Sequence, residues 1–462
     1  MNYQPDDLKS ILDYSKTLID KSLRDVCGTD LLTNSYKGKG NFGQLLEKYF
    51  YGYEPNSKSQ ADFDKVGMEL KTSPLKIIKK NQYRSKERLV LNIINYLDIH
   101  SEEFEKSTFL KKNYHILMIF YLHQLDVEVI DYVIKIVGDW KIPEVDLEII
   151  KRDWDSIREK ILRGKAHEIS EGDTIYLGAC TKGAKGGNLR EQPFSQIRAK
   201  QRAFSFKQGY LNHIIASLSN SKSDYGKLIS SPIELSIKPF EQIVVDKFDP
   251  YLNKSIEEIV QGLNQKSFNP NSKNFFSNVT KHILGIELNQ EIEEFEKGGI
   301  IVKTIRLKSN GLPKEDVSFP NFSYLKIINQ EWEDSEFKDI VESKFFFVFY
   351  RYGKDKLLRL DKVKFWNMSF DDINESQRVW EYTKEIVSKG NIVNKIKDGK
   401  RFTNFPSKKF SNVSHVRPHA LNSEDTFPLP VKDKVSGLSE YTKHCFWLNN
   451  SFIKDNIYLN EF

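Results

Sequence analysis

Cysteine is scarce in this chain. Its 462 residues include three cysteines, Cys27, Cys180 and Cys445, which lie far apart in the sequence. Neither a disulfide framework nor a Cys-x-x-Cys metal site can be built from that number and spacing, and the composition favours a reducing compartment. We therefore expect a cytoplasmic protein.

Long apolar runs are also missing. The most apolar stretches, such as 116–122 and 345–350, are too short to span a bilayer, and the first seven residues do not resemble a signal peptide. The formal net charge of +6 is mild, so it does not by itself indicate a nucleic-acid partner. The length allows two or three ordinary domains. We expect a protein that does not enter the membrane.

One short stretch carries most of the chemical information, Asp62 to Thr72. On a strand, the alternation places Glu69 and Lys71 on one face and Met68 and Leu70 on the other. An acid followed by Glu-x-Lys is what a metal-dependent phosphodiester nuclease needs, because two carboxylates hold a hard cation and a lysine steadies developing charge. On the motif alone, a solvated strand face with an ion pair is the more common explanation.

A third carboxylate precedes this stretch. Glu47 lies in an apolar segment that is predicted to form a helix from about 41 to 51. The commoner fate of such a residue is exposure on the helix surface. The functional interpretation is a carboxylate that points from the helix toward the strand carrying Glu69.

The surrounding pattern predicts an α/β domain. An amphipathic helix is expected over 6–25, strands over 89–96, 115–122 and 127–137, and a helix over 143–162, with a proline near its start and acids in its first turn. A mixed sheet with helices therefore follows the central motif.

A basic stretch, 181–207, is the second informative region. It contains glycines, a single acid, Glu191, and leads into an aromatic segment that ends at Tyr210. Such a segment suits phosphate contacts and groove-reading side chains, although it can also be a solvated basic loop. The residues predicted to contact DNA here are Lys182, Lys185, Arg190, Arg198, Lys200, Arg202, Lys207 and Tyr210.

The chain contains an internal repeat. Residues 294–304 match 62–72 without a gap, and three further pairs of segments keep the same order: 279–287 with 46–54, 345–350 with 116–121, and 446–453 with 204–211. We therefore expect two tandem domains, 1–225 and 246–462, joined by a linker at 226–245.

The second repeat has lost two of the three acids. Ile301 replaces Glu69, Thr280 falls where Glu47 stands, and Glu294 replaces Asp62. Because isoleucine cannot hold a metal ion, this copy should keep the fold without the reaction. It retains basic residues, among them Arg417, and could bind DNA. His415 and His419 could in principle ligate a metal, but no third ligand is evident, so we expect loop or DNA-facing roles for them.

The motifs resemble those of a known family. Gly43-x-x-Leu-Glu47, followed by Asp62-Phe-(x)3-Gly-Met-Glu69-Leu-Lys71-Thr72-x-Pro74, is similar to the mismatch-repair endonuclease MutH. The segments 86–96, 164–172 and 200–206 look like those of restriction endonucleases that carry MutH-like domains and cut at GATC. In that group a second, catalytically silent MutH-like domain binds a second DNA site.

The resemblance implies roles for individual residues. Asp62, Glu69 and Lys71 fall on the family's catalytic Asp, Glu and Lys, and Glu47 on its helix-borne Glu. Lys182 falls on a lysine of the DNA-recognition loop, although Cys180 and Thr181 replace the family's neighbouring Arg and Pro. The family's further active-site lysine corresponds to either Lys111 or Lys112.

Together these observations predict a type II restriction endonuclease. It would use Mg²⁺ held by Asp62 and Glu69, without a small-molecule cofactor, to cut double-stranded DNA before the G of GATC and leave a 5′ overhang. A DNA-induced homodimer would match the twofold symmetry of the site. The alternatives are a MutH-like nickase of mismatch repair and a DNA-binding protein without hydrolytic activity.

Overall fold

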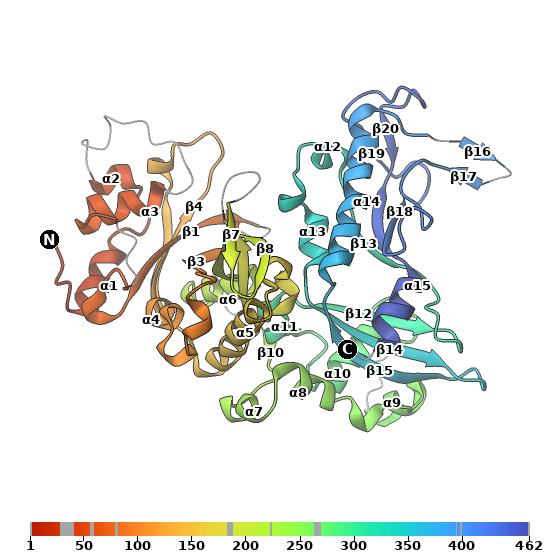
Figure 1. The fold of residues 1–462 in the computed structure, drawn as a ribbon, viewed down its shortest axis with the longest axis horizontal. Helices are drawn as coiled ribbons and strands as arrows, with labels where there is room; N and C mark the ends of the chain where they lie inside the picture. The colour runs from red at the N-terminus through yellow and green to blue at the C-terminus, as the bar shows by residue number, and fades with distance from the viewer. Residues whose placement is uncertain are drawn as a thin grey trace. The chain divides into compact units, whose positions relative to one another are not determined.

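The computed structural model divides the chain into two compact units (Figure 1). The first unit comprises Met1–Phe240 and Asn289–Gly299, and the second comprises Glu241–Leu288 and Ile300–Phe462. The residues that the structure describes are 2–27, 41–55, 60–78, 82–182, 188–221, 224–262, 269–393, 395–397 and 400–460.

The main sheet of the first unit has the strand order β2-β1-β4-β5. Its central strands β1 and β4 run parallel, and the outer pairs are antiparallel. The strands are β1 (Glu69–Ile77), β2 (Tyr83–Ser85), β4 (His115–Leu122) and β5 (Ile134–Lys141). Met68 and Leu70 are buried in a core shared with helix α1 (Leu8–Lys16), helix α3 (Asn41–Leu45) and the π-helix that continues it (Leu46–Tyr51). The predicted apolar face of β1 therefore anchors the strand.

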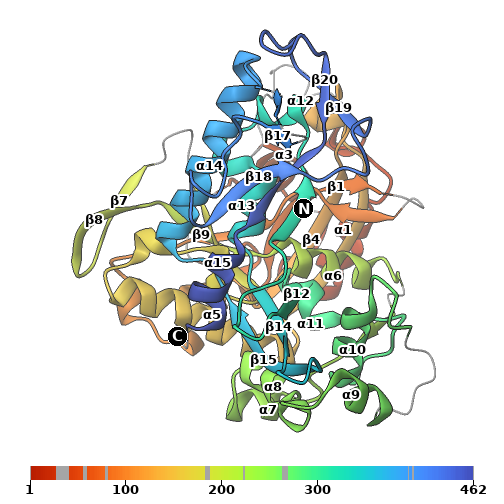
Figure 2. The same ribbon diagram turned by 90° about the vertical axis from the view of Figure 1, so that its right-hand side faces the viewer.

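A second sheet in this unit has the order β3-β9-β6, with antiparallel pairs. Helix α5 packs against β6, and a β7–β8 hairpin precedes β9 (Figure 2). The elements are β3 (Leu89–Ile93), α4 (Thr108–Asn113), α5 (Glu144–Leu162), β6 (Leu177–Thr181), β7 (Leu189–Gln192), β8 (Ser195–Lys200), β9 (Arg202–Phe206) and α6 (Gln208–Leu218).

The second unit repeats this topology. Strand β12 pairs in parallel with β14, which pairs antiparallel with β15, and β13-β21-β18 form an antiparallel sheet. The elements are β12 (Ile301–Leu307), β13 (Val317–Asn321), β14 (Phe345–Tyr352), β15 (Leu358–Trp366), α14 (Phe370–Lys389), β18 (Ser414–Pro418) and β21 (His444–Leu448). The second sheet in each unit has a long helix, α5 or α14, packed against it.

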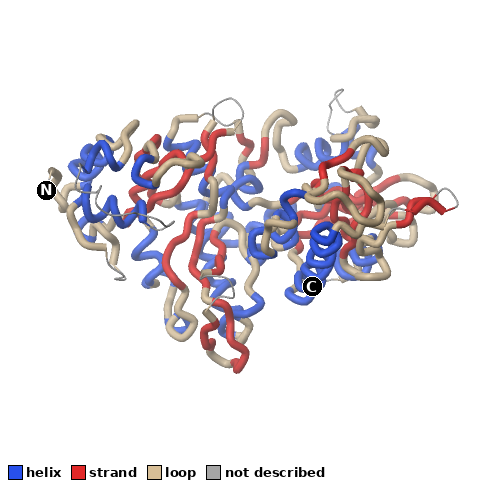
Figure 3. Tube along the Cα trace, turned by 90° about the horizontal axis from the view of Figure 1, so that it is seen from above, coloured by secondary structure: helices blue, strands red, loops and turns tan. Residues whose placement is uncertain are grey.

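Backbone conformation supports the same correspondence. Gly52 and Gly285, which align in the repeat, have φ of 78° and 77°, and Gly67 and Gly299 have φ of 65° and 63°. Residues with a side chain rarely adopt such angles, so both turns need glycine. The fold is mixed α/β with a degenerate second copy, as the sequence predicted, and strands are flanked by helices in each unit (Figure 3).

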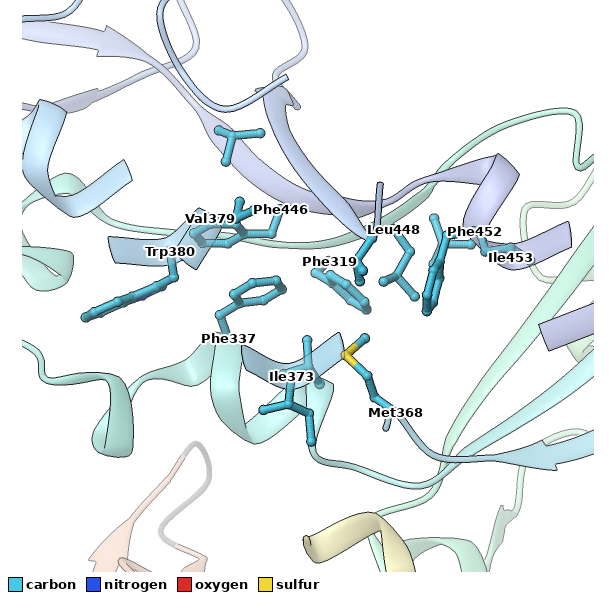
Figure 4. Packing of buried hydrophobic residues seen from close by; sticks show 14 of the residues in the cluster. Phe319, Phe337, Met368, Ile373, Val379, Trp380, Phe446, Leu448, Phe452 and Ile453 are labelled. Atoms are coloured by element: carbon cyan, nitrogen blue, oxygen red, sulfur yellow. The ribbon is translucent and has the colours of Figure 1, made fainter. Parts of the chain in front are cut away.

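The core of the second unit is rich in aromatic rings. Phe337 stacks on Phe446 with ring centroids 4.0 Å apart (Figure 4). The rings of Trp380 and Trp332 lie 5.8 Å apart between centroids. The cluster joins α13 and α14 to the β13-β21-β18 sheet. This packing holds the end of β18 in place.

The other elements are shorter. They are α2 (Leu23–Cys27), β10 (Tyr225–Gly226), α7 (Pro232–Ile237), α8 (Phe240–Asp246), α9 (Ile256–Gly262), α10 (Phe275–Ile283), β11 (Glu291–Ile292), α11 (Glu293–Gly298), α12 (Tyr324–Ile327), α13 (Glu336–Val341), β16 (Lys395–Lys397), β17 (Lys400–Phe402), β19 (Thr426–Pro428), β20 (Glu440–Thr442), α15 (Asn450–Phe452) and a π-helix (Ile453–Tyr458). Within the described residues, no helix is long and apolar enough to cross a membrane.

Helix α11 belongs in sequence to the second repeat but packs on α6 of the first unit. Its Lys297 Nζ lies 2.9 Å from Asp146 Oδ1 and 2.8 Å from Glu293 Oε1, with all three side chains buried. Tyr210 Oη donates a hydrogen bond of 3.1 Å to the same Asp146 carboxylate. A buried charge cluster therefore fixes the start of the second repeat to the first unit.

Several predicted element boundaries need correction. The helix expected over 6–25 is divided into α1 and α2, and the strand expected over 127–137 begins at Ile134. The aromatic segment at 204–210 ends as a strand at Phe206, so Tyr210 lies in helix α6. The segment 226–245 contains α7 and most of α8, because Leu235 and Val244 are buried.

Candidate active site

The candidate site lies at the start of strand β1 in the first unit. Asp62 is fixed there because the backbone N–H of Leu70 donates a hydrogen bond of 2.9 Å to its Oδ2. The turn between Asp62 and Glu69 closes at Gly67, whose positive φ brings the two acids to the same end of the strand. Asp62 and Glu69, which the sequence analysis assigned to one site, therefore lie at the same end of β1.

Glu69 is the most buried member of the site, with a side chain 2% exposed. Its Oε1 lies 2.5 Å from Lys71 Nζ and 3.5 Å from Lys112 Nζ. Its Oε2 is buried without a hydrogen-bond partner among the described residues. Burial raises the pKa of Glu69, and the charge of Lys71 opposes that shift.

Lys112 resolves a choice that the sequence left open. It lies on α4, and its side chain is 16% exposed and contacts Glu69, whereas the neighbouring Lys111 is exposed. The two lysines lie about 100° apart around a helix, so only one of them can point into the site. The sequence alone gave no signal for which one, because the orientation of α4 depends on its packing against the sheet.

Glu47 lies on the π-helix at Leu46–Tyr51. Burial, with the negative charge of Asp62 adding to it, raises the pKa of Glu47 to about 7. The same carboxylate is influenced by Lys71, Glu69 and Lys112, so Glu47 belongs to the same electrostatic cluster. Single-turn π-helices occur frequently at functional sites, and this one carries Glu47 in its first turn.

Tyr53 is a polar residue near the acids that the sequence did not single out. Its hydroxyl is buried without a hydrogen-bond partner among the described residues. Burial and then the charges of Asp62 and Glu47 raise its pKa. In the sequence, the only feature that could have drawn attention to Tyr53 is its position directly after Gly52, where the helix ends.

The residues fit a divalent cation. Glu69 Oε2, which has no hydrogen-bond partner among the described residues, and the carboxylate of Asp62 are hard oxygen ligands of the kind that Mg²⁺ takes, usually one or two carboxylates with several waters. In the described part of the chain, no group of three or more His, Cys, Asp or Glu residues is arranged to hold a metal. The remaining ligands would then come from water and phosphate.

Four of the predicted DNA-contact residues lie on or beside the β7–β8 hairpin. Arg190, Arg198 and Lys200 are exposed, and Lys182 is half-buried at the start of the preceding loop. Arg190 donates a hydrogen bond to Gln201, and Arg198 forms an exposed ion pair with Glu191. Lys185 lies outside the described residues.

Two predicted DNA contacts are corrected by their burial. Lys207 is buried, and its Nζ donates hydrogen bonds to the carbonyls of Glu171 and Thr174. Tyr210 is fully buried, and its hydroxyl donates a hydrogen bond to Asp146. Neither side chain is available to DNA in this structure, because both follow the end of β9, where the chain turns into the core. Arg202 is half-buried and donates to the carbonyl of Ala179.

The corresponding residues of the second repeat have different surroundings. Lys303, which aligns with Lys71, is largely buried, donates to the carbonyl of Ser318 and lies over the Phe319 ring. Burial lowers its pKa. Glu294, which aligns with Asp62, accepts hydrogen bonds from the backbone N–H groups of Leu228 and Ile229 in the first unit. The aligned residues of the second repeat are therefore used for structure.

The predicted residues near the end of β18 divide into buried and exposed positions. Arg417 is half-exposed, and His419 is exposed at the adjoining loop. His415 is buried, and its Nδ1 lies 2.6 Å from Asn449 Oδ1. His415 therefore does not face DNA, whereas Arg417 and His419 can.

Comparisons with known proteins relate this chain to two groups of nucleases. The family model described as "DNA mismatch repair enzyme MutH" matches residues 51–153, which contain Asp62, Glu69, Lys71 and Lys112. The DNA mismatch repair protein MutH of Shewanella amazonensis is 27% identical over 37% of this chain and 77% of its own length. The type II restriction enzyme Sau3AI of Staphylococcus aureus is 35% identical over 96% of both chains.

The fold and the site define a site-specific nuclease with a MutH-like domain. Its relation to Sau3AI extends over both units, whereas the match to the MutH protein covers little more than a third of the chain. The chain belongs to the family of type II restriction endonucleases that includes Sau3AI.

Proposed function

We propose that the chain is a Mg²⁺-dependent restriction endonuclease that cuts both strands of DNA before the G of 5′-GATC-3′. The observation that carries the proposal is the arrangement around Glu69. One oxygen of this buried carboxylate is contacted by two lysines, and the other is buried without a hydrogen-bond partner in the part of the chain that the structure describes. A buried polar oxygen without a partner is costly, and a cation bound to Oε2 would remove that cost.

Each residue then has a chemical role. Asp62 and Glu69 would hold Mg²⁺, and the bound cation would supply polarisation of the phosphate and a lowered pKa of a water. Lys71 and Lys112 lie where they can stabilise negative charge that develops on the phosphate oxygens. Glu47, with a pKa of about 7, is placed to accept a proton from water or to orient it.

The choice of GATC rests on family resemblance. The segments 86–96, 164–172 and 200–206 are similar to those of restriction enzymes that cut at this sequence. Lys182 and the β7–β8 hairpin, with exposed Arg190, Arg198 and Lys200, would approach the DNA. A product with a four-base 5′ overhang would follow from cutting each strand before G.

The second repeat is proposed to bind a second DNA site without cutting it. Ile301 and Thr280 replace the two glutamates of the first repeat, and the Glu294 carboxylate already accepts hydrogen bonds from backbone N–H groups. We assign catalysis to residues 1–225 and binding of the second DNA site to residues 246–462. Helix α11 lies within the second range but packs in the first unit. One acid pair per chain and a palindromic site favour a DNA-induced homodimer.

Metal removal and the form of the product test this function. With Mg²⁺, the purified protein should convert supercoiled unmethylated plasmid into linear fragments, and EDTA should stop the reaction because Asp62 and Glu69 lose their cation. Agarose gels resolve supercoiled, nicked and linear forms.

The same gels separate the alternatives. Stable nicked circles without linear product would favour a mismatch-repair nickase. Shifted but uncut DNA at every Mg²⁺ concentration would favour a protein that binds DNA without hydrolysis.

A further inference from the structure

The sheet register allows the two repeats to be aligned position by position. Phe206 pairs with Leu89 in the first unit, and Leu448 pairs with Val317 in the second. The residue before each of these partner strands is Arg88 in the first unit and Asp316 in the second.

The same alignment extends across the sheet. Cys180 stands opposite Ala203 in the first unit, and Arg417 stands opposite Cys445 in the second. On the middle strand of each sheet, Ser205 of the first unit corresponds to Trp447 of the second. The second unit thus has an acid, an arginine and a tryptophan where the first has Arg88, Cys180 and Ser205.

These three residues lie together in one site of the second unit. The Asp316 carboxylate is 5% exposed and accepts hydrogen bonds from Arg417 Nη1 at 3.1 Å and Lys408 Nζ at 2.5 Å. The backbone N–H of Asn450 donates to the same carboxylate at 2.8 Å. Arg417 and Lys408 each remain 43% exposed. One buried anion therefore holds two cations at the protein surface.

The Arg417 guanidinium also contacts an aromatic ring. Its central carbon lies 3.8 Å from the centroid of the Trp447 ring, a cation–π contact between β18, which carries Arg417, and its paired strand β21, which carries Trp447. Among the described residues its side-chain hydrogen bond is made through Nη1 to Asp316. The rest of the planar donor fork is left for an outside acceptor.

The position suits recognition of DNA. Arg417 stands at the end of β18, at the sheet edge where the corresponding strand of the first unit leads into the loop that begins with Lys182. The two oxygens of Asp316 have separate partners: Lys408 Nζ and the Asn450 N–H contact Oδ1, whereas Arg417 Nη1 contacts Oδ2, so one carboxylate sets the position of both cations. Oriented arginines read guanine through O6 and N7, and lysines beside them contact phosphate.

We infer that Arg417 is the base-reading residue of the second unit, that it binds the major-groove edge of a guanine, and that Asp316 is the residue that positions it. This inference rests on the proposed binding of a second DNA site by this unit. Lys408 contacts a neighbouring phosphate. Specificity at the second site then depends on the orientation of one guanidinium group.

Binding of short duplexes to the full-length protein in EDTA tests the inference, because no cutting occurs. The duplexes carry either one GATC or a scrambled sequence of the same composition, and calorimetry gives the number bound per chain. Wild type should bind two GATC duplexes. Arg417→Lys keeps the charge but not the planar fork, so the second site should lose about 10- to 100-fold of its preference for GATC with little change in salt dependence.

Three further variants complete the design. Asp316→Asn should lower the same preference while Arg417 is still present, and thermal unfolding checks that the variant folds. Lys408→Ala should weaken the binding of both duplexes equally and reduce the slope of log affinity against log salt concentration by about one. Arg359→Ala is the control, because Arg359 is also paired with a carboxylate, that of Asp355, but lies on strand β15. It should leave the affinity for both duplexes unchanged.

The outcomes separate this inference from the proposed function. A wild type that binds one duplex per chain refutes the second DNA site and the inference with it. Two duplexes per chain with unchanged preference in Arg417→Lys refute the inference alone. An equal loss for both duplexes in Arg417→Lys would make Arg417 a phosphate contact and would overturn its role in reading a base.

Discussion

Replacing Lys71 with alanine should lower the rate of DNA cleavage by on the order of 10³-fold. Lys71 Nζ lies 2.5 Å from the buried Glu69, in a site where few other groups can stabilise charge on phosphate. DNA affinity should change little, because Lys71 is largely buried at the start of β1 and supports chemistry more than docking. Single-turnover cleavage gives the rate, and fluorescence anisotropy in EDTA gives the dissociation constant.

A matched variant controls for loss of a positive charge. Lys76 lies on the same strand but is exposed, so Lys76→Ala should retain a cleavage rate near that of wild type. Glu69→Ile, which copies the residue of the second repeat, should be as inactive as Lys71→Ala. Cleavage by Lys71→Ala at the wild-type rate would overturn the assignment of the site to β1.

The second large effect concerns stability. Lys297→Met should destabilise the first unit by about 3–5 kcal/mol, because it leaves Asp146 and Glu293 buried without their cation. The side chain of Asp146 is 3% exposed, so water cannot replace the lost partner. Chemical denaturation followed by circular dichroism measures the change in the free energy of unfolding.

Lys227 provides the comparison for that experiment. It lies 3.8 Å from the same Glu293 but is 68% exposed, so Lys227→Met should cost no more than about 1 kcal/mol. Equal stability of the two variants would show that the buried cluster does not hold α11 on the first unit. The result also matters for truncation, since removal of everything after residue 240 would take α11 away from the unit in which it packs.

Local sequence patterns were sufficient for the parts of the fold that depend on nearest neighbours. The alternation of Met68 and Leu70 with Glu69 and Lys71 predicted both the strand and its buried face. The expected strand at 115–122 and helix at 143–162 agree with β4 and α5 to within a residue. The repeated glycines at 67 and 299 indicated the second copy because a turn with positive φ restricts residue choice.

Patterns of composition were less informative where burial depends on distant segments. Lys207 and Tyr210 look like DNA contacts in a basic, aromatic stretch, but both are enclosed by groups far away in sequence, including Glu171 and Asp146. The association of α11 with the first unit has the same origin. Its partner Asp146 lies 151 residues before Lys297, and no local signal connects them.

The candidate site shows the same division. Its two acids and Lys71 lie within ten residues of one another, so their spacing was readable. The contribution of Lys112 comes from another helix, α4, whose rotation is set by packing. The Asp316 site is composed of residues from β18, β21 and the loops before β13 and β18, and only the sheet register brings them together.

Sequencing the DNA ends produced from unmethylated plasmid with Mg²⁺ tests the central claim most directly. A restriction endonuclease whose first repeat cuts before the G of GATC should give fragments whose 5′ ends all begin with GATC on both strands. Ends at other sequences, or breaks confined to one strand, would contradict that account.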